Sequence, residues 1–329
     1  MDNGEKELIN FVRIAYKKLK ASVYYDKTLL PLRDKIVDFE DGEIENKLSS
    51  LALALFAKDD KTWNALETEI LNGIKVLTFP KKLEPISDET VIFNEPSDIK
   101  LKTPQYFIDL PVVGQIVGTL WVLSIGMALD TREDHNGMYE HSYGNRLRSK
   151  LSDENSLDLT YSTGLFESYF GQYSTWRDKG LKRAKECLEN KQDAMVLTLD
   201  FKNFYYSVEL NENNFKTFIS KFEEYRNCKS CYPWHKRVNE RINGFVLKVL
   251  EAYSTKLKIT NNNNDDDGKN DLKIESLRLL PIGFLPSPIL ANWVLTAFDN
   301  AVIERWNPVY YGRYVDDILI VDKVVLCKI

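Results

Sequence analysis

One stretch constrains the fold more than any other part of the sequence. It runs from Tyr311 to Asp322 and reads Y-G-R-Y-V-D-D-I-L-I-V-D. Two adjacent carboxylates, Asp316 and Asp317, separate a β-favouring run from an apolar one, which predicts a hairpin with acids at its tip. Taken alone, such a pair is more often a solvated turn. If the tip is poor in water, the two charges need a divalent cation, and hard oxygen ligands suit Mg²⁺.

A third acid closes another predicted strand. From Ala194 to Asp200 apolar and other residues alternate, which is typical of a buried strand that ends in a carboxylate. The next residues, F-K-N-F-Y-Y, predict an aromatic-rich turn whose rings would cover a small site. A simple capping role for Asp200 is the alternative.

A third element lies between these two. The loop 279–288 leads into a predicted helix that continues through Trp306, with Ser287 as its N-cap and Pro288 at its first position. Gly283 permits a backbone to lie close to a ligand. A plain core helix is the alternative, and it fully explains the apolar row Ile289, Trp293, Ala297 and Ala301. One acid from the strand and two from the hairpin would together hold two magnesium ions, which predicts nucleotidyl transfer.

In this order the three elements resemble motifs A, B and C of the reverse transcriptase family, over about residues 142–321. Asp200-Phe-Lys-Asn-Phe-Tyr-Tyr is similar to motif A, residues 283–292 to motif B, and Tyr314-Val-Asp-Asp to motif C. The resemblance implies an α+β right-hand polymerase, with fingers and an antiparallel palm sheet packed on helices. It implies an RNA-directed DNA polymerase that uses two Mg²⁺ ions, with Mn²⁺ as an alternative.

The same resemblance implies roles for individual residues. Asp200 and Asp316 would be metal ligands, with Asp317 as the third acid. Tyr205 falls at the sugar-gate position that selects deoxynucleotides. Further substrate contacts are expected from Phe201, Gly283, Ser287, Pro288, Arg146 and Arg148. Motif B departs from the family pattern, because Ile282 replaces a glutamine near the incoming nucleotide.

The closest subgroup resemblance is to bacterial phage-defence enzymes of the abortive-infection (Abi) type. That implies dNTPs as substrates and an RNA or DNA template and primer, or untemplated synthesis. The thumb is expected outside this chain, so that a homo-oligomer or a partner would supply it. A non-catalytic nucleic-acid-binding subunit or fragment is the alternative from another class.

The chain divides into three predicted parts: a helical region with the start of the fingers at 1–105, fingers at 106–193, and palm at 194–329 with a disordered insertion near 260–272. Helices are predicted at 5–25, 30–40, 48–56, 63–76, 213–224 and around 246–250. Loops and short strands are predicted at 79–104. A further helix, 176–190, has a basic side and begins with a capping-box relation between Thr175 and Asp178.

Composition narrows the class of protein. With 43% apolar and 28% charged residues, the sequence is typical of a soluble globular protein. The run Leu110 to Leu129 is interpreted as a buried helix and not a membrane span, because it contains glycines and a proline and lacks basic anchors. With a polar, acidic start, this predicts a cytoplasmic protein.

The net charge and the cysteine content exclude few classes of protein. A formal net charge of −5 argues against a uniformly basic surface but allows a local basic channel for nucleic acid. The four cysteines are too unevenly spaced for a disulfide framework. Cys228, Cys231 and His235 lack a fourth ligand for zinc.

Overall fold

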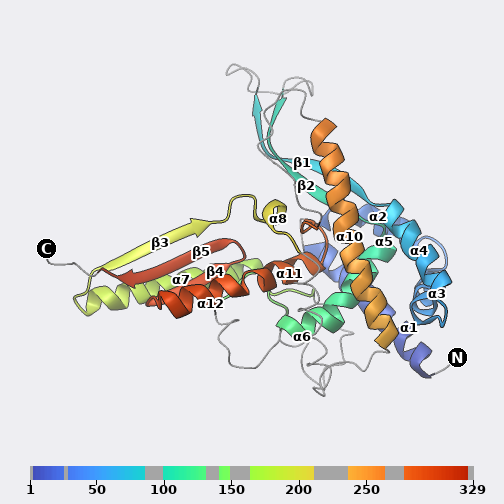
Figure 1. Ribbon diagram of the computed structural model, residues 1–329, viewed down its shortest axis with the longest axis horizontal. Helices are drawn as coiled ribbons and strands as arrows, with labels where there is room; N and C mark the ends of the chain where they lie inside the picture. Colours follow the sequence, from blue (N-terminus) through green and yellow to red (C-terminus); the bar gives the residue numbers. More distant parts are fainter. Residues whose placement is uncertain are drawn as a thin grey trace.

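The computed structural model describes residues 3–25, 29–85, 99–130, 141–148, 164–210, 236–263 and 278–324. Helices gather at one end of an elongated molecule, and a three-stranded sheet with its flanking helices forms the other end (Figure 1). Both sheets are antiparallel: one pairs β1 with β2, and the other has the order β3-β5-β4. The mixed helix and sheet architecture confirms the α+β class.

The amino-terminal helices follow the predicted apolar spacing. They are α1 (Asn3–Tyr25), α2 (Leu32–Glu40), α3 (Ile44–Phe56) and α4 (Asp60–Asn72). Helix α4 begins after Asp59, whose carboxylate accepts the backbone N–H groups of Lys61 and Thr62. It ends four residues before the predicted boundary because Gly73 closes it and the next strand begins.

A buried helix crosses the centre of the helical end. It comprises α5 (Val112–Trp121), a π-helical turn η3 (Val122–Gly126) and α6 (Met127–Asp130). Helix α5 packs against α1 and α10 (Lys236–Asn263), and Ile116, Val117 and Trp121 have no exposed surface. The run 110–129 is therefore a core helix, as predicted. No helix within the described residues combines the length and apolar character needed to cross a membrane.

The segment predicted as loops and short strands forms a long two-stranded ribbon. Strands β1 (Lys75–Pro85) and β2 (Ile99–Asp109) pair over eleven residues each. Pro80 lies opposite Pro104 in the register. Both strands of a two-stranded ribbon are edges, so a proline without an N–H group is tolerated there. The prolines therefore did not exclude strands.

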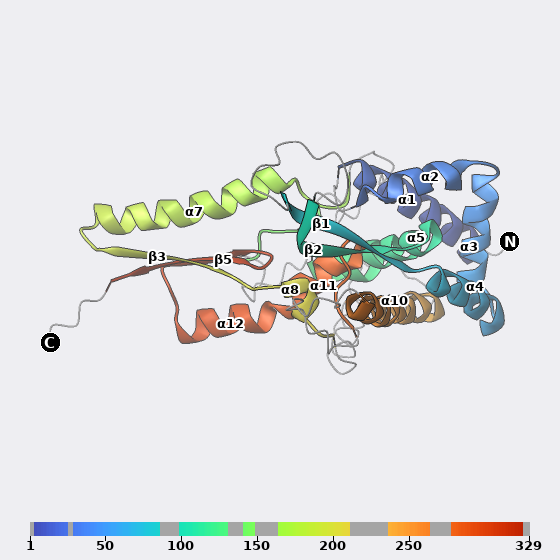
Figure 2. The ribbon, with the colours of Figure 1, turned by 90° about the horizontal axis from the view of Figure 1, so that it is seen from above.

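The three-stranded sheet consists of β3 (Ala194–Asp200), β4 (Tyr310–Tyr314) and β5 (Asp317–Lys323). Helices α7 (Tyr169–Glu189) and α12 (Thr296–Arg305) lie on its opposite faces (Figure 2). Gly180 lets α7 approach the sheet, because a Cβ at this position would overlap the side chain of Leu319. The sheet is thus buried through β4 and the middle of β5, while β3 is largely exposed.

Three local predictions were wrong. Helix α7 begins at Tyr169, so Thr175 lies inside it and donates its hydroxyl to Gly171 O, 2.8 Å away, in place of a capping box. Strand β3 is not buried: Val196 is 48% exposed, whereas the other edge strand, β4, is buried at every residue. The helix expected to continue through Trp306 breaks at Leu295 into α11 (Pro286–Val294) and α12.

Some predictions fall outside the described residues. These are the helix at 213–224, the cysteine pair at 228 and 231 with the histidine at 235, and most of the insertion near 260–272. The helix predicted around 246–250 is confirmed as part of α10, which extends to Asn263.

Candidate active site

The three predicted acids meet where β3 ends and the β4–β5 hairpin turns. Asp200 is the direct cross-strand partner of Asp317, which in turn lies opposite Tyr314. Directly opposed residues project from the same face of an antiparallel sheet, with Cα atoms about 5 Å apart. Asp316 occupies the two-residue turn beside Asp317. Two distant segments of the sequence therefore place Asp200 opposite Asp317, with Asp316 next to it in the turn.

The hairpin turn has an unusual backbone conformation. Val315 adopts φ +60°, a left-handed conformation that β-branched residues rarely occupy, and its side chain is only 6% exposed. Gly144 packs directly against it, because an added Cβ would lie 2.7 Å from Val315 Cγ2 and 2.9 Å from its backbone nitrogen. The loop containing Gly144 is itself bonded to β4: the Tyr143 N–H donates to Arg313 O, and the Arg313 N–H donates to His141 O. Strain of this kind persists only where the surroundings hold it in place.

The electrostatics of the three acids show unbalanced negative charge. Burial raises the pKa of Asp316 above its usual range, and the charges of Asp317 and Asp200 raise it further. Burial and the Asp200 charge also raise the pKa of Asp317. Lys81 on β1 acts in the opposite direction on both groups. A divalent cation between these carboxylates would remove the cost of keeping them ionised.

The donor chemistry fits magnesium, since all three groups offer hard carboxylate oxygens. Within the described part of the chain, however, no group of three or more His, Cys, Asp or Glu side chains is gathered as a preformed metal cage.

A buried ion pair anchors the hairpin to the helices behind the sheet. Arg313 on β4 is 1% exposed and Asp299 on α12 is fully buried. The Arg313 guanidinium donates to both Asp299 oxygens, at 2.8 and 3.0 Å from Nε, and to Asn292 Oδ1 at 2.8 Å. Tyr311 Oη donates to the same Asp299 carboxylate at 2.5 Å. This network connects the acid-bearing hairpin to α11 and α12.

Sequence reasoning missed this anchor and the lysine opposite the acids. Arg313 was visible as a charged residue within a predicted buried strand, and such a residue needs a buried partner. Nothing in the sequence identified Asp299 as that partner. Lys81 gave no signal, because its segment was interpreted as loops and short strands.

Aromatic side chains from α7 flank the acids and were also missed. The Tyr314 ring makes edge contacts with Tyr169 and Tyr173, at centroid distances of 5.2 and 5.5 Å. Tyr169 is 54% exposed and Phe170 81%. Large exposed rings beside an acidic site are a surface on which bases can stack.

The aromatic-rich turn after Asp200 forms the short helix α8 (Phe204–Ser207), which follows a left-handed Asn203 at φ +56°. Tyr205 lies in α8 and packs edge-on against Phe204, and its carbonyl accepts the Leu280 N–H at 3.3 Å. Phe201 packs against Phe298 of α12 at 5.3 Å. The turn thus links β3 to the loop before α11.

The loop before α11 is fixed from two sides. Gly283 adopts φ +90°, and its carbonyl accepts a hydrogen bond from Gln115 Nε2 on α5 at 2.9 Å. The Ile108 N–H on β2 donates to Ile282 O at 2.9 Å. Gly283 is therefore at a position where the backbone itself requires glycine.

The predicted cap of this helix was wrong. Helix α11 begins at Pro286, and its N-cap residue is Leu285 without a side-chain bond. Ser287 and Pro288 therefore lie in the first turn. Ser287 is 1% exposed, and its hydroxyl has no hydrogen-bond partner among the described residues.

The two arginines predicted to contact substrate are held by the protein. Arg146 donates from Nε to Asp130 Oδ1 at 2.9 Å and from its terminal nitrogens to the Ser142 and Asp130 carbonyls. Arg148 donates from Nε to Phe166 O at 3.0 Å. A phosphate contact from Arg146 would have to share or replace these bonds.

Comparison with known families identifies the chain. A model described as reverse transcriptase (RNA-dependent DNA polymerase) matches residues 145–323, which include all three acids and the loop before α11. The protein belongs to the reverse transcriptase family. This membership supports a function of the nucleotidyltransferase type. The comparison with curated proteins returned no match.

Proposed function

We propose that the protein is a reverse transcriptase that adds deoxynucleotides to a primer by two-metal nucleotidyl transfer. The observation that carries this proposal is the direct cross-strand pairing of Asp200 with Asp317, beside Asp316 in the turn. The raised pKa values of Asp316 and Asp317 add support, since they indicate negative charges that neighbouring cations do not fully balance.

In this proposal Asp200 and Asp316 hold two Mg²⁺ or Mn²⁺ ions, and Asp317 is the third acid. The bound ions would supply Lewis-acid stabilisation of the attacking and leaving oxygens. Lys81 lies close enough to act electrostatically on the acids and would balance charge on an incoming triphosphate. The primer 3′-hydroxyl would give up its proton to solvent water and attack the α-phosphorus, so that a new P–O bond forms as the bond to pyrophosphate breaks in line.

The remaining predicted contacts belong to the same proposal. Tyr205 would exclude the ribose 2′-hydroxyl. Substrate or template contacts are assigned to Phe201, Gly283, Ser287, Pro288, Arg146 and Arg148. Residues 106–193 would act as fingers and 194–329 as palm, after a helical region at 1–105. Ser287 has a buried hydroxyl without a hydrogen-bond partner among the described residues, so a substrate group could bond to it.

The direct test is an incorporation assay with labelled dNTPs, Mg²⁺, and RNA, DNA or no template. Asp316→Asn should abolish incorporation, because it removes a charged ligand while keeping the size of the side chain. Asp193→Asn is the matched control, since this exposed acid precedes the opposite end of β3. Equal incorporation by wild type and Asp316→Asn would refute polymerase activity at this site.

A second candidate function is a non-catalytic nucleic-acid-binding subunit. It is favoured by the lack of a preformed three-ligand cluster among the described acids. Such a subunit would bind RNA or DNA equally well with or without Mg²⁺, and Asp316→Asn would leave binding unchanged. Metal-dependent incorporation by the wild type would remove this alternative.

A role in phage defence, of the abortive-infection type, is the proposed biological setting. It rests on the sequence resemblance and the helical amino-terminal region. Phage plating on cells that carry the wild-type gene or Asp316→Asn would test it: defence that depends on the acid supports the proposal, and equal plaque counts oppose it.

A further inference from the structure

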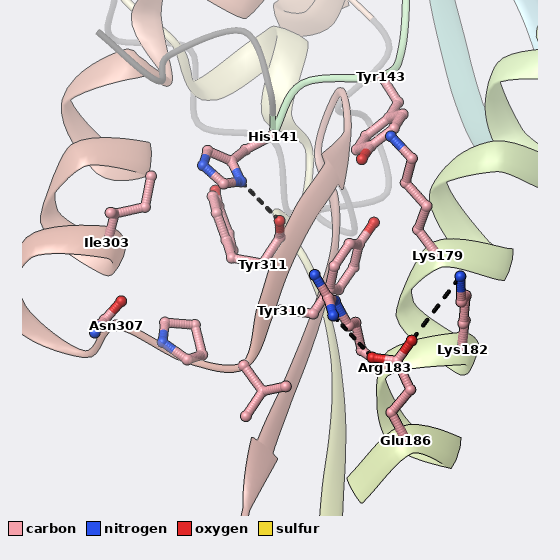
Figure 3. Close-up of a pocket in the computed structure, with 12 residues that line it drawn as sticks. His141, Tyr143, Lys179, Lys182, Arg183, Glu186, Ile303, Asn307, Tyr310 and Tyr311 are labelled. Atoms are coloured by element: carbon pink, nitrogen blue, oxygen red, sulfur yellow. Dashed lines mark hydrogen bonds and ion pairs between the residues drawn. The ribbon is translucent and has the colours of Figure 1, made fainter. Parts of the chain in front are cut away.

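A cavity of about 610 Å³ opens along the outer edge of β4, away from the acids (Figure 3). One wall is α7, with Lys179, Lys182 and Arg183. The opposite wall comes from the end of α12 and the residues after it, including Ile303 and Asn307. Residues 141 and 143 close a third side.

The charge of this cavity is positive although the chain as a whole carries a formal charge of −5. Three cations and a single carboxylate, Glu186, line it. Glu186 lies 2.8 Å from Arg183 and 4.0 Å from Lys182 and so fixes both side chains at the rim. Lys179 has no ion pair with any described residue, and its ammonium lies 5.0 Å from the centroid of the Tyr143 ring. An anion entering here would meet a cation without a carboxylate partner.

The remaining lining indicates a ligand larger than a bare anion. Tyrosines and apolar side chains make up much of the remaining lining: Tyr143, Tyr310, Ile303, Pro308 and Val309. Tyr310 is held in place, because its hydroxyl donates to Trp176 O at 2.8 Å. Cavities of a few hundred Å³ that combine apolar walls with a few charged groups accept small organic ligands. Lys and Arg on one wall match a phosphate, and the opposite wall matches a sugar and base.

The cavity is separate from the acids. Tyr310 is the first residue of β4 and the acids follow its last, so at about 3.3 Å per residue Tyr310 lies roughly 15 Å from the acids along the strand. Tyr311 and Tyr143 line the side of the cavity nearer to the hairpin, since Tyr143 is bonded to Arg313. No side chain lines the cavity and also belongs to the acid group.

We propose that this cavity is a second binding site for a nucleotide unit, with its phosphate on Lys179 and Arg183 and its base toward Ile303 and Pro308. The bound unit is a free nucleotide or the terminal nucleotide of a single strand, since both present a phosphate, a sugar and a base. The site is independent of the proposed catalytic function, because none of its residues takes part in that function.

The test is equilibrium dialysis with radiolabelled dTMP in EDTA, where metal-dependent binding at the acids is absent. The variant Lys179→Glu/Arg183→Glu should weaken dTMP binding at least about tenfold, since two phosphate contacts are reversed. Lys185→Glu is the matched control: it lies on the same helix, is 77% exposed and does not line the cavity, so it should bind as the wild type does. Asp316→Asn should also bind normally.

Competition experiments distinguish a free nucleotide from the end of a single strand as the natural ligand. Displacement of dTMP by an equal concentration of hexathymidylate supports a strand end, and failure of hexathymidylate to compete supports a free nucleotide. Displacement by inorganic phosphate as effective as by unlabelled dTMP would overturn the proposal, because a bare anion would then suffice. Equal dTMP affinity in the wild type and the double variant, or no wild-type binding at millimolar dTMP, would also overturn it. Circular dichroism checks that each variant is folded.

Discussion

Removal of one partner of the Arg313–Asp299 pair is expected to cost much of the stability of the protein. Arg313→Met leaves a carboxylate that is fully buried and keeps only the Tyr311 hydroxyl from this network. An uncompensated buried charge of this kind typically costs about 3–5 kcal/mol. Total stabilities of domains are about 5–15 kcal/mol, so the single variant should unfold at a much lower denaturant concentration.

The double variant Arg313→Met/Asp299→Leu separates the effect of an unpaired charge on stability from the effect of altered packing. Replacement of both partners by apolar residues removes the unpaired charge, and Asn292, Tyr311 and the Val315 carbonyl lose hydrogen bonds, at about 1–3 kcal/mol. The double variant should therefore be more stable than either single variant. The coupling energy between the two positions should be at least about 3 kcal/mol.

Urea unfolding followed by far-ultraviolet circular dichroism measures all four proteins of this cycle. Incorporation assays on the folded double variant add a second readout, because loss of the anchor should misplace Asp316 even where the protein is stable. Single-variant losses below about 1 kcal/mol, or a double variant equal to the sum of the singles, would refute the view that this pair anchors the hairpin.

Three further predictions concern single positions. Asp316→Asn should stabilise the metal-free protein at pH 7, and the gain should vanish below about pH 4 in thermal unfolding. The raised folded-state pKa means that the ionised acid destabilises the folded protein only above the unfolded-state pKa, so a pH-independent gain would contradict this. Gly180→Ala should lower the free energy of unfolding by about 1–3 kcal/mol, because the added methyl overlaps the buried Leu319 side chain on β5. Gly244→Ala, in open space on α10, should raise the free energy of unfolding by up to about 1 kcal/mol. Urea midpoints that shift in the same direction for both variants would contradict the packing argument. Gln115→Leu should lower the free energy of unfolding by about 1–3 kcal/mol and reduce nucleotide incorporation, since the Gly283 carbonyl loses its hydrogen-bond donor. An unchanged urea midpoint would show that the fold does not depend on this hydrogen bond.

Much of the candidate site was readable from local pattern. The alternation that ends at Asp200 and the acid pair between two β-favouring runs predicted a strand and a hairpin, and both are present. These patterns act over a few residues, where strand periodicity and turn geometry decide the outcome. The core helix at 110–129 and the amino-terminal helices were predictable for the same reason.

Tertiary structure alone decided which distant groups meet. The register that places Asp200 opposite Asp317, the choice of Asp299 as the partner of Arg313, and the approach of Lys81 to the acids each join segments far apart in the sequence. The exposure of β3 was likewise invisible, because its alternation is compatible with both a central and an edge strand. Local sequence determines the conformation and periodicity of each element. The partners of each element depend on the packing of the whole chain, because burial and charge pairing are satisfied only when all elements are in place.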